Sequence, residues 1–209
     1  MRTSIKKFHR FSGIVIAGFL LLHLSNHLFA LGGPELHIKV MEMLRPVYRF
    51  WPVEFLLLLC VAFQVVSGLT LVFTKRIFKQ PLYVVIQVVS GLYLAFFLIF
   101  HVRAVLMGRY LWHTDTNFYF AAGVANRYPE KLFFIPYYSL SLICIFAHLA
   151  CVHYIRRKEQ LSKSTLVYSN ENINAICKRE TFIISAGGAV ITLLIMLSLT
   201  GVLYPITFH

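Results

Sequence analysis

Long stretches of apolar residues without a single charged side chain alternate with short polar segments along this chain. The charge-free runs together hold 120 of the 209 residues and cover 11–34, 55–74, 80–102, 132–155 and 181–209. A helix needs about 20 apolar residues to cross a hydrocarbon layer about 30 Å thick. The pattern therefore predicts five transmembrane helices, at about 11–31, 55–74, 82–105, 133–155 and 181–204.

The connections between these spans are short enough to favour antiparallel neighbours, so we expect one all-α transmembrane domain over residues 1–209. The segment 35–50 is predicted to form a short helix on the membrane surface. Its apolar residues recur at helical spacing, at Leu36, Val40, Leu44 and Val47. Tyrosine and tryptophan residues in 108–131 indicate a cap at the membrane interface.

The composition supports a membrane protein and excludes several other classes. Hydrophobic residues make up 58% of the chain and charged residues only 13%, whereas soluble domains carry about 25% charge. A large soluble catalytic domain and a nucleotide-binding fold are excluded, because too few residues remain outside the spans. The length of the apolar runs also excludes a β-barrel, whose strands alternate over about ten residues.

The net charge of +12 reflects basic residues that flank the spans, which argues against nucleic-acid binding. Thirteen of the 20 lysines and arginines fall in segments that share a side with the N-terminus. The positive-inside rule then predicts a cytoplasmic N-terminus and, with five spans, a C-terminus outside. We expect the membrane to be a bacterial inner membrane. The polar segment 159–177 is long for a helix–helix connection, so we expect contact with a partner protein to order it.

The first and third spans repeat one pattern. Residues 12–23 read SGIVIAGFLLLH and residues 90–101 read SGLYLAFFLIFH, with serine, glycine, phenylalanine and histidine at identical offsets. The second and fourth spans correspond more weakly, through Gln64 and His148, each four residues after a cysteine. The pattern predicts two copies of a two-helix hairpin, followed by a fifth helix.

His23 and His101 are the main candidates for chemistry, because ionisable groups within membrane spans are costly and commonly functional. Each follows its serine by eleven residues, so serine, phenylalanine and histidine share one face of each helix. Two inward imidazoles on neighbouring helices suit the axial ligation of a haem iron. Zinc would need three or four ligands. The alternative is that each imidazole hydrogen-bonds a neighbouring helix and only packs the bundle.

His148 is a candidate ligand of a second haem, but Gln64, at the corresponding position of the second span, is a poor iron ligand. The alternative is a hydrogen bond between Gln64 and His148, and we expect one firmly held haem. His27, one turn beyond His23, would hold a haem propionate or replace His23 as ligand. His153, near the inner boundary, is expected at the interface.

Three further residues complete the candidate cofactor-binding set. Ser12 shares the helix face of His23. Arg10, beside His9 at the start of the first span, would bind a propionate or a quinone carbonyl, or would only anchor the helix at the membrane surface. Arg103 follows His101 by two residues and would neutralise a propionate on the other side.

The motif HRFSG at 9–13, with the order of the span histidines, resembles the cytochrome b membrane anchor of succinate dehydrogenases and fumarate reductases, in its single-chain five-helix form. The resemblance implies haem ligands on the first four helices. His23, His101 and His148 fall at three of these places, and Gln64 departs from the fourth.

The resemblance implies a haem b protein that passes electrons between quinone and partner subunits carrying flavin and iron–sulfur clusters on the cytoplasmic face. The chain itself has neither a G-x-G-x-x-G motif nor a cysteine cluster for those cofactors. Two alternatives remain: an accessory or assembly subunit without a redox role, and a stand-alone b-type cytochrome.

Overall fold

The computed structural model describes residues 2–73, 79–163 and 169–206. These residues form an all-α bundle, which confirms the predicted fold class. The helices are α1 (Arg2–Phe29), α2 (Pro34–Tyr48), α3 (Trp51–Phe73), α4 (Leu82–Tyr110), α5 (Phe118–Asn126), α6 (Lys131–Lys163) and α7 (Asn170–Leu199). A 3₁₀ turn, η1 (Ala30–Gly32), follows α1. Among the described residues, α1 (with η1), α3, α4, α6 and α7 are long and apolar enough to cross a membrane, as the charge-free runs predict.

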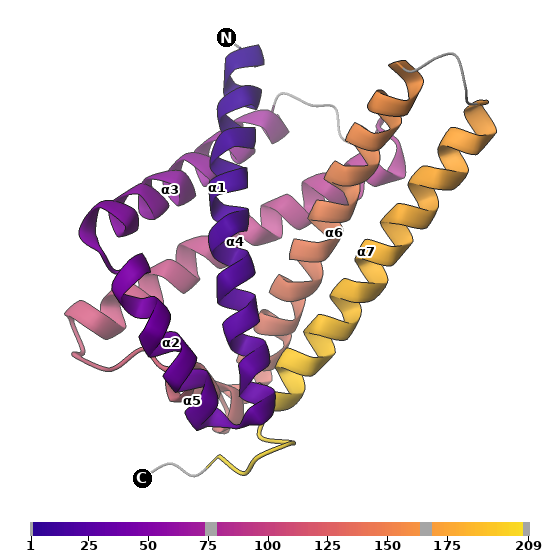
Figure 1. Cartoon of the computed structure of the whole chain (residues 1–209). Coiled ribbons are helices and arrows are strands. Elements are labelled where there is room, and N and C mark those ends of the chain that lie inside the picture. The colour runs from indigo at the N-terminus through magenta and orange to yellow at the C-terminus, as the bar shows by residue number, and fades with distance from the viewer. Residues whose placement is uncertain (1, 74–78, 164–168, 207–209) are drawn as a thin grey trace.

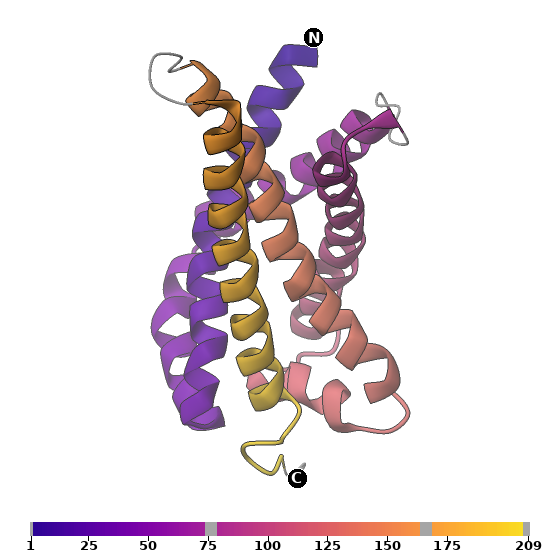
Figure 2. The same cartoon turned by 90° about the vertical axis from the view of Figure 1, so that its right-hand side faces the viewer.

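The two ends of the chain lie at opposite ends of the bundle, which we call its N-terminal and C-terminal sides (Figure 1). Helices α6 and α7 pack along each other, and α4 packs against α6. Helix α1 pairs with α3, so the first four spans form the pairs α1–α3 and α4–α6 (Figure 2). The short helices α2 and α5 cover the C-terminal side of the bundle.

Local sequence signals set where the short helices begin. Gly33 adopts a φ of 106°, which glycine tolerates without strain, and Pro34 then occupies the first turn of α2. The Asn117 side chain accepts a hydrogen bond of 2.9 Å from the backbone N–H of Tyr119 and so caps α5.

Helix α2 confirms the short helix expected at 35–50. His37 and Met41 are buried against the protein, whereas Leu36 and Val47 are exposed. The contact of the apolar residues of α2 with a membrane surface stays a prediction. The face of α2 that packs against the protein buries a polar histidine, which an apolar pattern alone does not indicate.

The polar segment 156–180 is mainly helical, because α6 continues to Lys163 and α7 begins at Asn170. Helices α6 and α7 thus extend past their charge-free runs, and the premise of a long connector over 159–177 was wrong. Leu161, Ile173 and Cys177 form a small core between the two helices. This packing within the chain orders the parts of 159–177 that are described, while residues 164–168 lie outside the described residues.

A second core closes the C-terminal side of the bundle. It contains buried residues of η1, α5 and α7: Ala30, Phe118, Ala122, Ala125 and Leu199. The Asn126 side chain donates a hydrogen bond of 2.9 Å to the Leu199 carbonyl, and the Tyr204 hydroxyl donates one of 2.8 Å to the Leu31 carbonyl. The first contact joins α5 to the end of α7. The second joins the residues after α7 to η1, at the end of α1.

Candidate functional site

Four histidines from α1, α2 and α4 are joined by ring contacts, and we call them the histidine cluster: His23, His27, His37 and His101. The ring centroids of His23 and His101 lie 6.2 Å apart, although they belong to α1 and α4. His27 lies 4.8 Å from His23 and 5.1 Å from His37, again between ring centroids. The sequence predicted His23 and His101 as a pair, and the structure brings them together.

Each histidine of the central pair stacks on the phenylalanine one turn earlier in its helix. Phe19 and His23 have a centroid distance of 5.5 Å and an interplanar angle of 18°. Phe97 and His101 have a distance of 5.0 Å and an angle of 14°. The repeated offset in the sequence therefore becomes a repeated side-chain arrangement, and the stacking limits the orientations open to both imidazoles.

Helix α6 holds the α4 half of this arrangement in position. The Tyr137 hydroxyl donates a hydrogen bond of 3.2 Å to the Phe97 carbonyl, and the Tyr93 hydroxyl donates one of 3.0 Å to the Tyr137 carbonyl. The Tyr137 ring also lies 4.9 Å from that of Phe97. These reciprocal contacts fix the rotation of α4, and with it the direction of His101.

His37 completes the cluster from α2. Only 2% of its surface is exposed, and its Nε2 lies 3.2 Å from the Asn26 side-chain nitrogen, a hydrogen bond that requires Nε2 to accept. Burial, with a smaller contribution from His23, lowers the pKa of His37 to about 4. Among the described residues, His37 Nδ1 and Asn26 Oδ1 are buried without a hydrogen-bond partner.

The central pair offers two imidazoles from two helices. Within the described ranges, no group of three or more His, Cys, Asp or Glu side chains has a geometry that could hold a metal ion. The rings of His23 and His101 meet edge to face, at an interplanar angle of 67°. A haem iron bound by histidines takes imidazole nitrogens of this kind, so His23 and His101 are the residues that would hold it.

A second polar group lies nearer the N-terminal side, between α1 and α3. The Ser12 hydroxyl donates a hydrogen bond of 2.7 Å to Gln64 Oε1, and Gln64 Nε2 lies 3.2 Å from His9 Nε2. His9 Nδ1 is 2.7 Å from the Ser67 hydroxyl. Gly13 allows this approach, since a Cβ there would lie 3.3 Å from Gln64 Nε2.

The corresponding positions of α4 and α6 make the equivalent contact. His148 Nδ1 lies 3.3 Å from the Ser90 hydroxyl and 2.9 Å from the Gln87 carbonyl. A Cβ on Gly91 would lie 3.1 Å from His148 Cε1. The Ser-Gly of α4 thus meets His148 as the Ser-Gly of α1 meets Gln64, as expected for two copies of one hairpin.

The hydrogen bond considered between Gln64 and His148 is replaced by these separate contacts in the described structure. Each side chain bonds within its own helix pair, so neither reaches the other. His9, which the sequence suggested only as a donor beside Arg10, is the imidazole that Gln64 contacts.

The remaining candidates lie apart from the histidine cluster. Arg10 is exposed and lines a cavity of about 170 Å³ with Arg156, Glu159, Gln160 and Lys163. Arg103 is exposed, and its side chain makes no hydrogen bond or ion pair with the described residues. His153 Nε2 lies 2.7 Å from Glu180 Oε2 and links α6 to α7. The structure thus gives His153 an acidic partner that the sequence reasoning did not identify.

The sequence reasoning also missed His37. Its position four residues before Met41 is the signal that could have found it, because both side chains lie on the buried face of α2. Comparisons with protein-family models, curated proteins and solved structures found no match to this chain.

Proposed function

We propose that this chain is a membrane-embedded haem b protein in which His23 and His101 are the two axial ligands of one haem. The observation that carries the proposal is the 6.2 Å between their ring centroids, across two helices that are distant in the sequence. A bound haem would supply reversible one-electron chemistry at its iron. The chain would hold that haem, set its orientation and exclude water from it.

The surroundings of the pair support a cofactor more than simple packing. Histidines that only join helices need hydrogen-bond partners, and no side-chain hydrogen bond links His23 to His101 in the described structure. Both rings instead stack on phenylalanines, which leaves their nitrogens available as ligands. The unpaired Nδ1 of His37, which carries the ring proton when Nε2 accepts from Asn26, adds a donor suited to a propionate next to His27.

The chain would pass electrons between quinone and flavin and iron–sulfur subunits, as the membrane anchor of a complex resembling succinate dehydrogenase or fumarate reductase. The HRFSG motif and the order of the span histidines support this role. The cavity lined by Arg10 and Arg156 adds basic groups on the N-terminal side, where such subunits would bind. That side would face the cytoplasm of a bacterial inner membrane.

The stand-alone cytochrome is the second candidate, and one observation favours it. Leu161, Ile173 and Cys177 pack between α6 and α7 in the described parts of 159–177, and this packing within the chain supports a structure that forms without a partner protein. Such a protein would keep the haem between His23 and His101 and act without flavin or iron–sulfur subunits.

Purification of the tagged chain from its native host in a mild detergent distinguishes the two roles. A membrane anchor should co-purify with flavin and iron–sulfur subunits in fixed ratio and show the spectrum of a reducible b-type haem. The same spectrum without partners would establish the stand-alone cytochrome. Other membrane proteins co-purifying with a haem-free chain would refute both and support the accessory subunit.

A further inference from the structure

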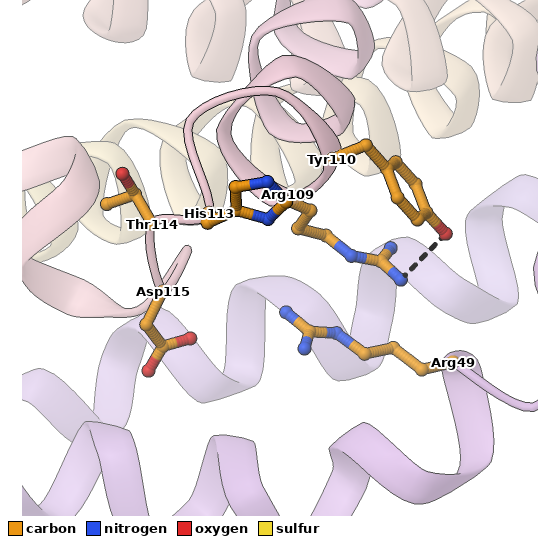
Figure 3. A pocket seen from close by; sticks show the side chains of 6 residues that line it. All are labelled: Arg49, Arg109, Tyr110, His113, Thr114 and Asp115. Atoms are coloured by element: carbon orange, nitrogen blue, oxygen red, sulfur yellow. Dashed lines mark hydrogen bonds between the residues drawn. The ribbon is translucent and has the colours of Figure 1, made fainter.

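A cavity of about 350 Å³ opens on the C-terminal side of the bundle, away from the histidine cluster. It lies where the loop after α4 faces the connection between α2 and α3. Its lining residues are Arg49, Arg109, Tyr110, His113, Thr114 and Asp115. Figure 3 shows the guanidinium groups of Arg49 and Arg109 reaching toward the same space from opposite walls.

Charges around the cavity do not balance. Arg109 pairs with both carboxylate oxygens of Glu54, and Arg45 pairs with Asp115 at 2.7 Å. Arg49 only donates a hydrogen bond of 3.1 Å to the Thr116 hydroxyl, and no carboxylate pairs with it among the described residues. One guanidinium charge at the cavity is therefore left without an acidic partner.

The environment of Arg49 makes this excess charge unfavourable. Burial lowers the pKa of Arg49, and the positive charges of Arg45 and Arg109 lower it further, against smaller opposing effects of Tyr48 and Asp115. A bound anion would relieve this repulsion and satisfy free N–H donors. The planar guanidinium fork matches carboxylate and phosphate oxygens in particular.

We propose that this cavity is a binding site for a small oxyanion, a carboxylate or phosphate group held between Arg49 and Arg109. The cavity is open to the surface, so a small oxyanion can reach both guanidinium groups. The same group would be presented either by a free solute or by the headgroup of an anionic lipid. His113, which is exposed on the same loop, adds a ring N–H donor at the rim.

Calorimetric titration with inorganic phosphate tests this proposal, using the full chain in neutral detergent with chloride added to matched ionic strength. Wild type should bind phosphate saturably. Arg49→Gln should weaken binding about tenfold or more, because one charge-assisted contact is lost. Arg49→Lys, which keeps the charge without the fork, should fall between them. Arg127→Gln makes the same charge change at an exposed position of the same side and should bind as wild type does.

A second titration distinguishes the source of the oxyanion. If the titration with free phosphate gives no heat, the lipid headgroup is tested instead. The thermal stability of the chain is then measured in nanodiscs of phosphatidylcholine with and without phosphatidylglycerol. Thermal stabilisation by phosphatidylglycerol that is lost in Arg49→Gln and kept in Arg127→Gln supports a lipid headgroup. Equal behaviour of Arg49→Gln and wild type toward both probes would overturn the site.

Discussion

The ring centroids of His23 and His101 lie 6.2 Å apart across the contact between α1 and α4, and each ring stacks on the phenylalanine one turn before it. The two rings have similar surroundings because the two spans repeat Ser-Gly, Phe and His at the same offsets. Two imidazoles in matched surroundings are well suited to sharing one iron. The first prediction tests whether both are needed.

Replacing either His23 or His101 with alanine should abolish a low-spin haem spectrum, because the iron would lose one of its two axial nitrogens. His113→Ala is the matched control, since His113 is exposed on the loop after α4 and should leave the spectrum unchanged. Visible spectra of the purified variants provide the measurement. Intact low-spin spectra in both His23→Ala and His101→Ala would rule out this ligand pair.

The ratio of haem to protein should be one, because Gln64 occupies the place where a second pair would need an imidazole. Gln64 is hydrogen-bonded to Ser12 and His9 instead. A pyridine haemochrome assay on pure protein gives the ratio directly. A ratio of two would contradict the prediction and would point to His9, beside Gln64, as the replacement ligand.

Gly188→Ala should destabilise the contact between α6 and α7, because the new Cβ would overlap the Phe146 side chain. We expect a loss of about 1–3 kcal/mol, which is typical of overpacking. Gly187→Ala is the matched control, since a Cβ there would meet nothing within 4 Å. Thermal unfolding in detergent should show a lower Tm only for Gly188→Ala. Equal Tm values would show that Phe146 moves aside freely.

Stability should fall as the pH drops below about 6.5, partly because His37 is buried in its neutral form. Its pKa is lowered from 6.5 to about 4, so between these values the unfolded chain binds a proton that the folded chain does not. The contribution of His37 is thus present above pH 6.5 and is lost toward pH 4, by up to about 3 kcal/mol.

The Tm of wild type and of two variants, measured between pH 7.5 and pH 4.5, tests the contribution of His37 to stability. His37→Gln should depend less steeply on pH than wild type and should keep a low-spin haem, since His37 is not an axial ligand in this account. His113→Gln should follow the wild-type curve. If the His37→Gln and wild-type curves were parallel, protonation of His37 would not be coupled to folding.

The amino-acid sequence was sufficient for the spans and for the central histidine pair, for different physical reasons. The length of a charge-free run reflects the thickness of the membrane, so the five spans were predictable. The helices themselves continue past the charge-free runs, as α6 does to Lys163. His23 and His101 were found because their helices repeat one pattern. Helix periodicity does not say which helices touch, so the separate partners of Gln64 and His148 could not be derived.

His37 shows the same limit on a smaller scale. The apolar spacing of α2 predicted a helix, and the structure confirms it. The side of α2 that packs against the protein depends on Asn26 and His27 of α1, which offer polar and aromatic contacts to His37. Such a contact between helices leaves no signal in the pattern of either helix alone.

The reduced-minus-oxidised visible spectrum of the purified chain, produced in cells with ample haem, tests the central claim most directly. If His23 and His101 ligate one haem, the reduced protein shows a Soret band with sharp α and β bands, as expected for low-spin iron with two axial imidazoles. A preparation of folded protein without a Soret band, or with the broad bands of high-spin haem, would contradict the account.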